Sequence, residues 1–88
     1  MAGWRVEFSS AAARQFRKLP GPLQLRILPH IESLAYEPRP NGAKKLVADE
    51  ELWRIRVGLY RVVYAIRDSV LVVLVVKVGH RRDVYRTW

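Results

Sequence analysis

The amino-acid sequence predicts a two-layer α+β domain in which a helical hairpin packs on one face of a mainly antiparallel β-sheet. Three consecutive strand patterns fill residues 52–78, and two helix patterns occupy residues 11–36. One short strand pattern precedes the helices and another follows them, so the predicted order is strand, helix, helix, strand, strand, strand, strand. A chain of 88 residues can bury one small core, and we expect a single domain over residues 1–88.

The first strand and the first helix are predicted from residues 4–19. Apolar and charged side chains alternate over residues 4–8, as in a half-buried strand. Ser9 and Ser10 are good N-cap residues for an alanine-rich helix over residues 11–19. The apolar side chains that share one side of this helix are Ala12, Phe16 and Leu19. That side is expected to pack on the sheet.

A second helix is predicted over about residues 22–36. Pro20 and Gly21 end the first helix, and Pro22 suits the first turn of the next one. Pro29 lies inside the second helix, where a proline removes a backbone hydrogen bond, so we expect a kink or a short break there. The apolar stripe of this helix is formed by Leu23, Ile27, Ile31 and Leu34. Two such helices return the chain along itself, which allows the first strand to lie beside the last.

The C-terminal half supplies the remaining strands. Residues 44–47 are expected to form a short edge strand, whose lysines protect the edge from pairing with another chain. Residues 52–58 and 60–67 alternate between apolar and polar side chains, as in strands with one covered face. Residues 70–78 are almost entirely valine and leucine, which is typical of an interior strand covered on both faces.

A tight hairpin is predicted at Gly58-Leu59, because glycine in the first loop position suits a type II′ turn. With a two-residue loop, the register places Arg56 directly opposite Arg61, on the face away from the apolar side chains. Like charges directly opposite one another destabilise a sheet. Two interpretations therefore remain open. Either an anion binds between the arginines, or the long side chains spread apart into water.

The composition restricts the class of partner. The chain has 16 Lys and Arg against 8 Asp and Glu, a net charge of +8, which favours nucleic acid, an acidic protein or an anionic membrane surface. No apolar run is long enough to span a bilayer and no signal-peptide pattern is present, so we expect a cytoplasmic protein without membrane contact. The absence of cysteine excludes disulfides and thiolate metal sites, and no cofactor or metal is expected.

Three segments together resemble the RelE/ParE superfamily of type II toxin–antitoxin toxins. They are GAKKL, LWRIRVGLYRVVYAI and VKVGHRRDVYR, and the resemblance extends over residues 4–86 in element order. It implies a RelE-like fold. It also implies one of two activities. RelE-branch toxins are ribosome-dependent endoribonucleases that cut mRNA in the A site, whereas ParE-branch toxins inhibit DNA gyrase and generally lack the nuclease residues.

The resemblance assigns roles to four residues. Arg61 matches the RelE arginine that holds the scissile phosphate, Arg81 the arginine that stabilises or protonates the leaving group, and Tyr85 the tyrosine that stacks with the substrate nucleotide. His80 stands where the best-known RelE has lysine, while some relatives use a nearby histidine as a catalytic acid or base. These four residues are the predicted catalytic set.

One departure from the RelE pattern concerns the general base. Arg54 and Arg56 stand where that RelE has strand lysines, one of which is its proposed base. A guanidinium is always protonated near neutral pH and is a poor base. His80 is the neighbour whose side-chain type accepts or donates a proton at neutral pH. The residues predicted to bind substrate are Lys44, Lys45, Arg54, Arg56, Arg82 and Arg86.

The chemistry expected of these residues is metal-free RNA cleavage. The adjacent 2′-OH attacks the phosphate, giving a 2′,3′-cyclic phosphate and a 5′-OH, and cations stabilise the added charge. The expected partners are a cognate antitoxin protein, the ribosome and mRNA, with operator DNA bound only through the antitoxin. Two alternatives remain: a ParE-like toxin that inhibits gyrase by binding, and an inactive member that acts only within a DNA-binding complex.

Overall fold

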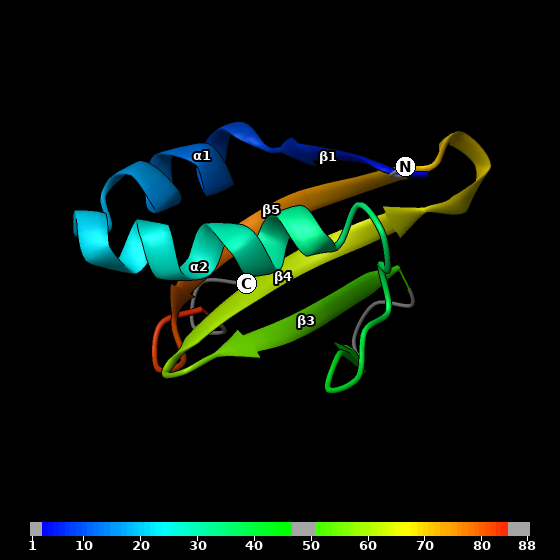
Figure 1. Ribbon diagram of the computed structural model, residues 1–88. Coiled ribbons are helices and arrows are strands. Elements are labelled where there is room, and N and C mark those ends of the chain that lie inside the picture. The colour runs from blue at the N-terminus through cyan, green and yellow to red at the C-terminus, as the bar shows by residue number, and fades with distance from the viewer. Residues whose placement is uncertain (1–2, 47–50, 85–88) are drawn as a thin grey trace.

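The computed structural model describes residues 3–46 and 51–84 (Figure 1). The elements in chain order are β1 (Arg5–Phe8), α1 (Ser10–Arg17), α2 (Gly21–Ser33), β2 (Lys44–Lys45), β3 (Leu52–Val57), β4 (Tyr60–Arg67), a 3₁₀ turn (Asp68–Val70) and β5 (Val72–His80). The predicted Tyr85 and Arg86 sites and the end of the predicted edge strand at Val47 lie outside the described residues. None of the described helices is long and apolar enough to cross a membrane.

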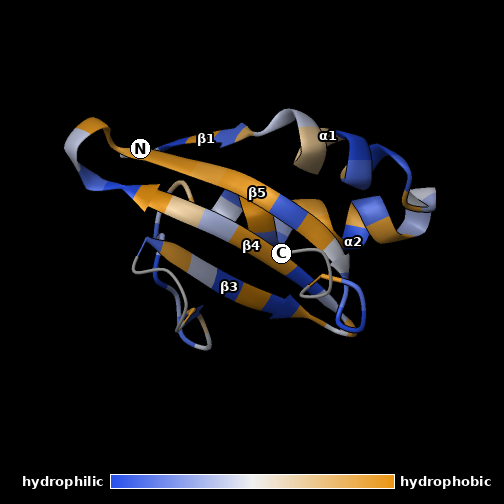
Figure 2. Ribbon diagram, turned by 180° about the vertical axis from the view of Figure 1, so that it is seen from behind, coloured by the Kyte–Doolittle hydropathy of each residue, from blue (hydrophilic) through white to orange (hydrophobic). Residues whose placement is uncertain are grey.

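All five strands form one sheet in the order β1-β5-β4-β3-β2. β1 runs parallel to β5, and the other neighbours are antiparallel. Both helices cover the same face of this sheet, and within residues 3–46 and 51–84 the opposite face carries no helix (Figures 1 and 2). The predicted α+β class, the element order and the placement of the first strand beside the last are therefore confirmed.

The core lies between the helices and the sheet. Its buried members from the helices are Ala12, Ile27, Ile31 and Leu34, and those from the sheet are Ile55, Val57, Val62, Tyr64, Ile66, Val73, Val75 and Val78. Tyr64 donates a hydrogen bond from its hydroxyl to the Pro38 carbonyl oxygen at 2.7 Å. Burial raises the pKa of Tyr64 well above its ordinary value, so the hydroxyl remains a donor.

Ser9 caps α1 as predicted, because its Oγ accepts the Ala12 N–H at 3.1 Å. The α2 prediction needs two corrections. The helix ends at Ser33 and not near Tyr36, and it runs through Pro29 without a break. The carbonyl that loses its partner to Pro29 belongs to Leu25, and both residues are exposed, so water can take the place of the missing hydrogen bond.

The β3–β4 hairpin has the predicted register. Arg56 lies opposite Arg61, and the turn between the strands contains Gly58 at φ +59°. The left-handed backbone at Gly58 strains any residue that has a side chain. A Cβ there would also lie only 3.2 Å from the Arg26 guanidinium, and both facts explain glycine at this position. The start of β5 was predicted two residues too early. Asp68–Val70 form a 3₁₀ turn, and Leu71 adopts a left-handed conformation at φ 53°, so pairing begins only at Val72.

Candidate functional site

The sheet face opposite the helices is here called the open face, and it carries a group of basic side chains from four strands. Strand alternation and register place on it Lys44, Arg54, Arg56, Arg61 and Lys77. They form two rows across the sheet. The first row consists of Lys44, Arg54, Val63 and Lys77, in the order β2, β3, β4, β5. In the second row Arg56 pairs with Arg61. Directly opposite residues in a sheet lie about 4.5–5.5 Å apart, within reach of one phosphate.

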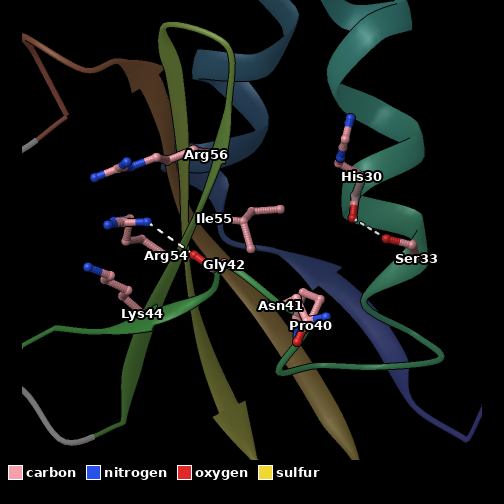
Figure 3. A pocket seen from close by; sticks show the side chains of 9 residues that line it. All are labelled: His30, Ser33, Pro40, Asn41, Gly42, Lys44, Arg54, Ile55 and Arg56. Carbon is pink, nitrogen blue, oxygen red and sulfur yellow. Dashed lines mark hydrogen bonds between the residues drawn. The ribbon is translucent and has the colours of Figure 1, made fainter.

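Arg54 is held firmly in this face. Only 7% of the residue is exposed, and its Nη1 donates a hydrogen bond to the Gly42 carbonyl oxygen at 3.4 Å. Figure 3 shows Arg54 and Arg56 of β3 and Lys44 of the neighbouring β2 extending to one side, while Ile55 points the other way, toward α2. These residues line a pocket of about 380 Å³ at the outer edge of β3. His30 and Ser33 of α2 and residues 40–42 form its other wall, so the pocket lies between this edge of the sheet and α2.

Arg61 is oriented by the hairpin turn beside it. Its Nη1 donates to the carbonyl oxygens of Gly58 at 3.0 Å and Tyr60 at 2.9 Å. The neighbour of Arg61 on β5 is Gly79, which has no side chain to cover the guanidinium. Arg61 and Arg56 therefore lie side by side at the hairpin end of the open face. A pair of guanidinium groups can bind a phosphate through charge-assisted hydrogen bonds.

The C-terminal turn after β5 brings Arg81 to the same end of the sheet. The Arg81 N–H donates to the Leu59 carbonyl oxygen at 2.8 Å, which ties this turn to the tip of the β3–β4 hairpin. Val84 anchors the turn, because it is buried in a second apolar cluster on the open face. The other buried members of that cluster are Leu52, Val63 and Ala65. The turn thus brings Arg81 to the hairpin that carries Arg61.

His80 has a structural contact that the sequence did not indicate. Its Nδ1 accepts the Arg82 N–H at 3.1 Å, so in the neutral ring the proton is on Nε2. In register His80 pairs with Tyr60, which packs against the helix-side core, and the two rings meet edge to face at 5.6 Å. His80 thus lies at the end of β5 on the helix side, next to Arg81 in the chain but not on the open face.

The remaining predicted residues are distributed as follows. Lys45 pairs with Trp53, so it does not point to the open face as Lys44 does. Arg81 and Arg82 are exposed in the C-terminal turn. The structure therefore brings together Lys44, Arg54, Arg56 and Arg61, with Arg81 at their border, and separates Lys45 from them. Among the described residues, no three His, Asp or Glu side chains are grouped so that they could hold a metal ion.

Lys77 is a member of the open face that was not predicted. Strict alternation along β5 would place it in the helix-side core, because Val73 and Val75 face that core. The register shifts between Val63 and Tyr64, so that Val63 pairs with Lys77 whereas Tyr64 pairs with Val75. The lone lysine in an otherwise apolar strand was the available signal in the sequence.

Comparison with known proteins shows which family and which solved structures the chain is similar to. The family described as "ParE toxin of type II toxin-antitoxin system, parDE" matches residues 6–85. No curated protein matches the chain. Among solved structures, the archaeal RelE–RelB complex from Pyrococcus horikoshii OT3 contains a chain 28% identical, with a TM-score of 0.78, covering 91% of this chain and 97% of that one.

Two further structures are similar over almost the same span. The toxin–antitoxin complex RelBE2 from Mycobacterium tuberculosis contains a chain 29% identical, with a TM-score of 0.78, covering 89% of this chain and 98% of that one. The intact RelBE complex of E. coli contains a chain 25% identical, with a TM-score of 0.79. The match covers 89% of this chain and 96% of that one. Since the family match spans nearly the whole chain and RelE toxins share its fold, the chain belongs to the RelE/ParE superfamily of type II toxin–antitoxin toxins.

Proposed function

We propose that the chain is a ribosome-dependent endoribonuclease that cuts mRNA in the ribosomal A site. The observation that carries this proposal is the arginine pair Arg56–Arg61, opposite each other on a sheet face without helices. Arg54 extends the same charge along β3. A face with this much positive charge stabilises a phosphate that gains negative charge during cleavage. Solved RelE toxins from three organisms have the same fold.

In the proposed reaction, the 2′-OH of the substrate nucleotide attacks the adjacent phosphorus and the bond to the 5′-oxygen breaks. Arg61 and Arg56 hold the non-bridging phosphate oxygens through charge-assisted hydrogen bonds. Arg81, tied to the hairpin tip, stabilises the departing oxygen. Tyr85, three residues after Arg82, stacks on the nucleotide base as the resemblance implies.

Two protons move in this reaction. Because Nδ1 of His80 accepts the Arg82 N–H, Nε2 is the atom that carries a proton in the neutral ring. His80 lies on the helix side at the end of β5, so we assign Nε2 to donation toward a 5′-oxygen that departs around this end of the strand, next to Arg81. The 2′-OH proton needs a different acceptor. Lys44 lies beside Arg54 on the open face and has an amine, which accepts a proton in its neutral form, so we assign it this step. The products are a 2′,3′-cyclic phosphate and a 5′-OH.

We further propose that a cognate antitoxin protein binds the chain. The similar structures from P. horikoshii, M. tuberculosis and E. coli are toxin–antitoxin complexes. A net charge of +8 favours an acidic antitoxin and fast association at low salt. Contact with operator DNA would then occur through the antitoxin and not through the open face.

A second candidate function is inhibition of DNA gyrase by binding. The family that matches the chain is described as the ParE toxin, and the lysines of the RelE strand are arginines here. In this alternative the basic open face binds its target without cutting it.

Brief expression of the toxin in a bacterial host separates the two functions. We expect primer extension on a translated mRNA to show new 5′ ends within codons, at the ribosomal A site, within minutes of induction. An untranslated version of the same mRNA, with its start codon removed, serves as the control and is expected to stay intact. Intact mRNA together with loss of DNA supercoiling would instead support gyrase inhibition and contradict the nuclease proposal.

A further inference from the structure

We infer that Lys77 is an additional substrate-contacting residue, which binds the RNA phosphate next to the scissile one. The inference rests on the proposed nuclease function and adds a position on β5 to a site otherwise built from β2, β3, β4 and the C-terminal turn. Three observations carry it: an irregularity in β5, the position of Lys77 relative to Arg54 and Arg61, and the hollow that Lys77 lines.

The irregularity is a β-bulge at Val76. Val63 pairs with Lys77 and Tyr64 pairs with Val75, so Val76 is the extra residue on β5. Val76 packs on the open-face cluster that contains Val63, and Val78 returns to the helix-side core with Val62. The bulge therefore moves Lys77 from the core to the open face. Bulges that redirect one side chain are common beside active sites.

Lys77 lies near two arginines of the open face, Arg54 and Arg61. It lies in one row with Arg54, the two flanking Val63, and diagonally from Arg61 across β4 and β5. Diagonal neighbours in a sheet are about 7–8 Å apart, close to the spacing of successive phosphates in an extended strand. Only 8% of Lys77 is exposed, so its side chain is held by its neighbours and little side-chain freedom remains to be lost on binding.

A hollow of about 380 Å³ at the edge of β5 is lined by Lys77 together with His80 and Tyr60, and Gln15, Lys18 and Leu19 at the end of α1 line its helix side. Asp83 also lines it, as the one carboxylate of this lining. The hollow connects Lys77 with the residue that we assign to proton donation. A strand of RNA whose scissile phosphate lies at Arg61 can therefore continue toward β5, with its next phosphate at the Lys77 amine.

The test compares three purified variants on ribosomes programmed with a defined mRNA: Lys77→Met, Lys77→Arg and the control Arg14→Met. Arg14 is an exposed arginine in α1 and does not line the Lys77 hollow, so the control removes one positive charge from the helix layer. Single-turnover cleavage is measured against toxin concentration and against KCl, and rates are normalised to the folded fraction from thermal unfolding. We expect Lys77→Met to raise the half-saturating toxin concentration roughly 10- to 100-fold, as for loss of a charge-assisted hydrogen bond.

Lys77→Arg keeps the charge and is expected to stay within a few-fold of wild type, as is Arg14→Met. The salt dependence of binding should become shallower in Lys77→Met alone, because one phosphate contact fewer releases fewer counterions. Equal half-saturation and equal salt dependence for folded Lys77→Met and wild type would overturn the inference while leaving the nuclease proposal intact. If wild-type toxin cuts no mRNA on these ribosomes, both the inference on Lys77 and the nuclease proposal are contradicted.

Discussion

Arg61→Ala and Arg81→Ala should each abolish growth inhibition without unfolding the protein. Arg61 lies at the hairpin end of the open face, where it faces Arg56, and the Arg81 N–H is bonded to the Leu59 carbonyl oxygen of the same hairpin. Removing one cation that stabilises the transferring phosphate costs about 2–4 kcal/mol of transition-state stabilisation, or roughly 30- to 1,000-fold in rate. Colony formation after induction and single-turnover cleavage on programmed ribosomes measure the loss.

Arg67→Ala is the matched control, since Arg67 is an exposed arginine at the far end of the same strand as Arg61. It should remain as toxic as wild type. The fold of every variant is checked by its unfolding temperature, because Arg61 also bonds two carbonyl oxygens of the hairpin turn. Folded Arg61→Ala that stops growth as wild type does would show that the arginine pair does not hold the scissile phosphate.

His80→Gln and His80→Asn should both lower the cleavage rate by roughly 10²–10⁴-fold, the usual range for general acid–base catalysis. The two variants separate the two functions of the ring. An Asn side-chain oxygen can replace Nδ1 and accept the Arg82 N–H, which keeps the C-terminal turn in place, whereas Gln places its amide near the position of Nε2. Neither amide transfers a proton at neutral pH, so both variants should lose the proton-donation step.

His80→Asn is the decisive variant of this pair. If it cleaves within a few-fold of wild type, His80 only holds the turn that carries Arg81, and the proton donor must be another group. Arg14→Ala, which changes an exposed helix residue, serves as the control for nonspecific loss of activity.

Most of the fold could be predicted because the sequence is locally consistent. The alternation in β3 and β4, the glycine of the hairpin and the serine cap of α1 all agree with the final structure. The boundaries of α2 and β5 could not be predicted well. The end of α2 depends on how residues 34–36 turn toward β1, where the Trp4 N–H bonds the Ala35 carbonyl, and the start of β5 depends on a left-handed leucine at position 71. Secondary-structure propensities predict neither the Trp4–Ala35 hydrogen bond nor the left-handed backbone of Leu71.

The candidate site was predicted only in part, for two physical reasons. A sequence pattern assigns faces by strict alternation, and the bulge at Val76 breaks that alternation, so Lys77 was not recognised. The resemblance placed His80 beside Arg81 in the chain, but not on a face of the sheet, and its pairing with Tyr60 could be seen only in the structure. Lys44 and Lys45 are neighbours in sequence, yet only Lys44 shares a face with Arg54.

The most direct test of the central claim uses purified toxin and ribosomes programmed with an mRNA that carries a single 2′-deoxynucleotide at the A-site cleavage position. If the open face stabilises attack by the 2′-OH, the all-ribose mRNA should be cut to fragments ending in a 2′,3′-cyclic phosphate and a 5′-OH. The deoxy mRNA should bind the toxin equally well and stay intact. Cleavage of the deoxy mRNA at the same position, or no cleavage of either mRNA, would contradict the assignment of the open face as a ribonuclease site.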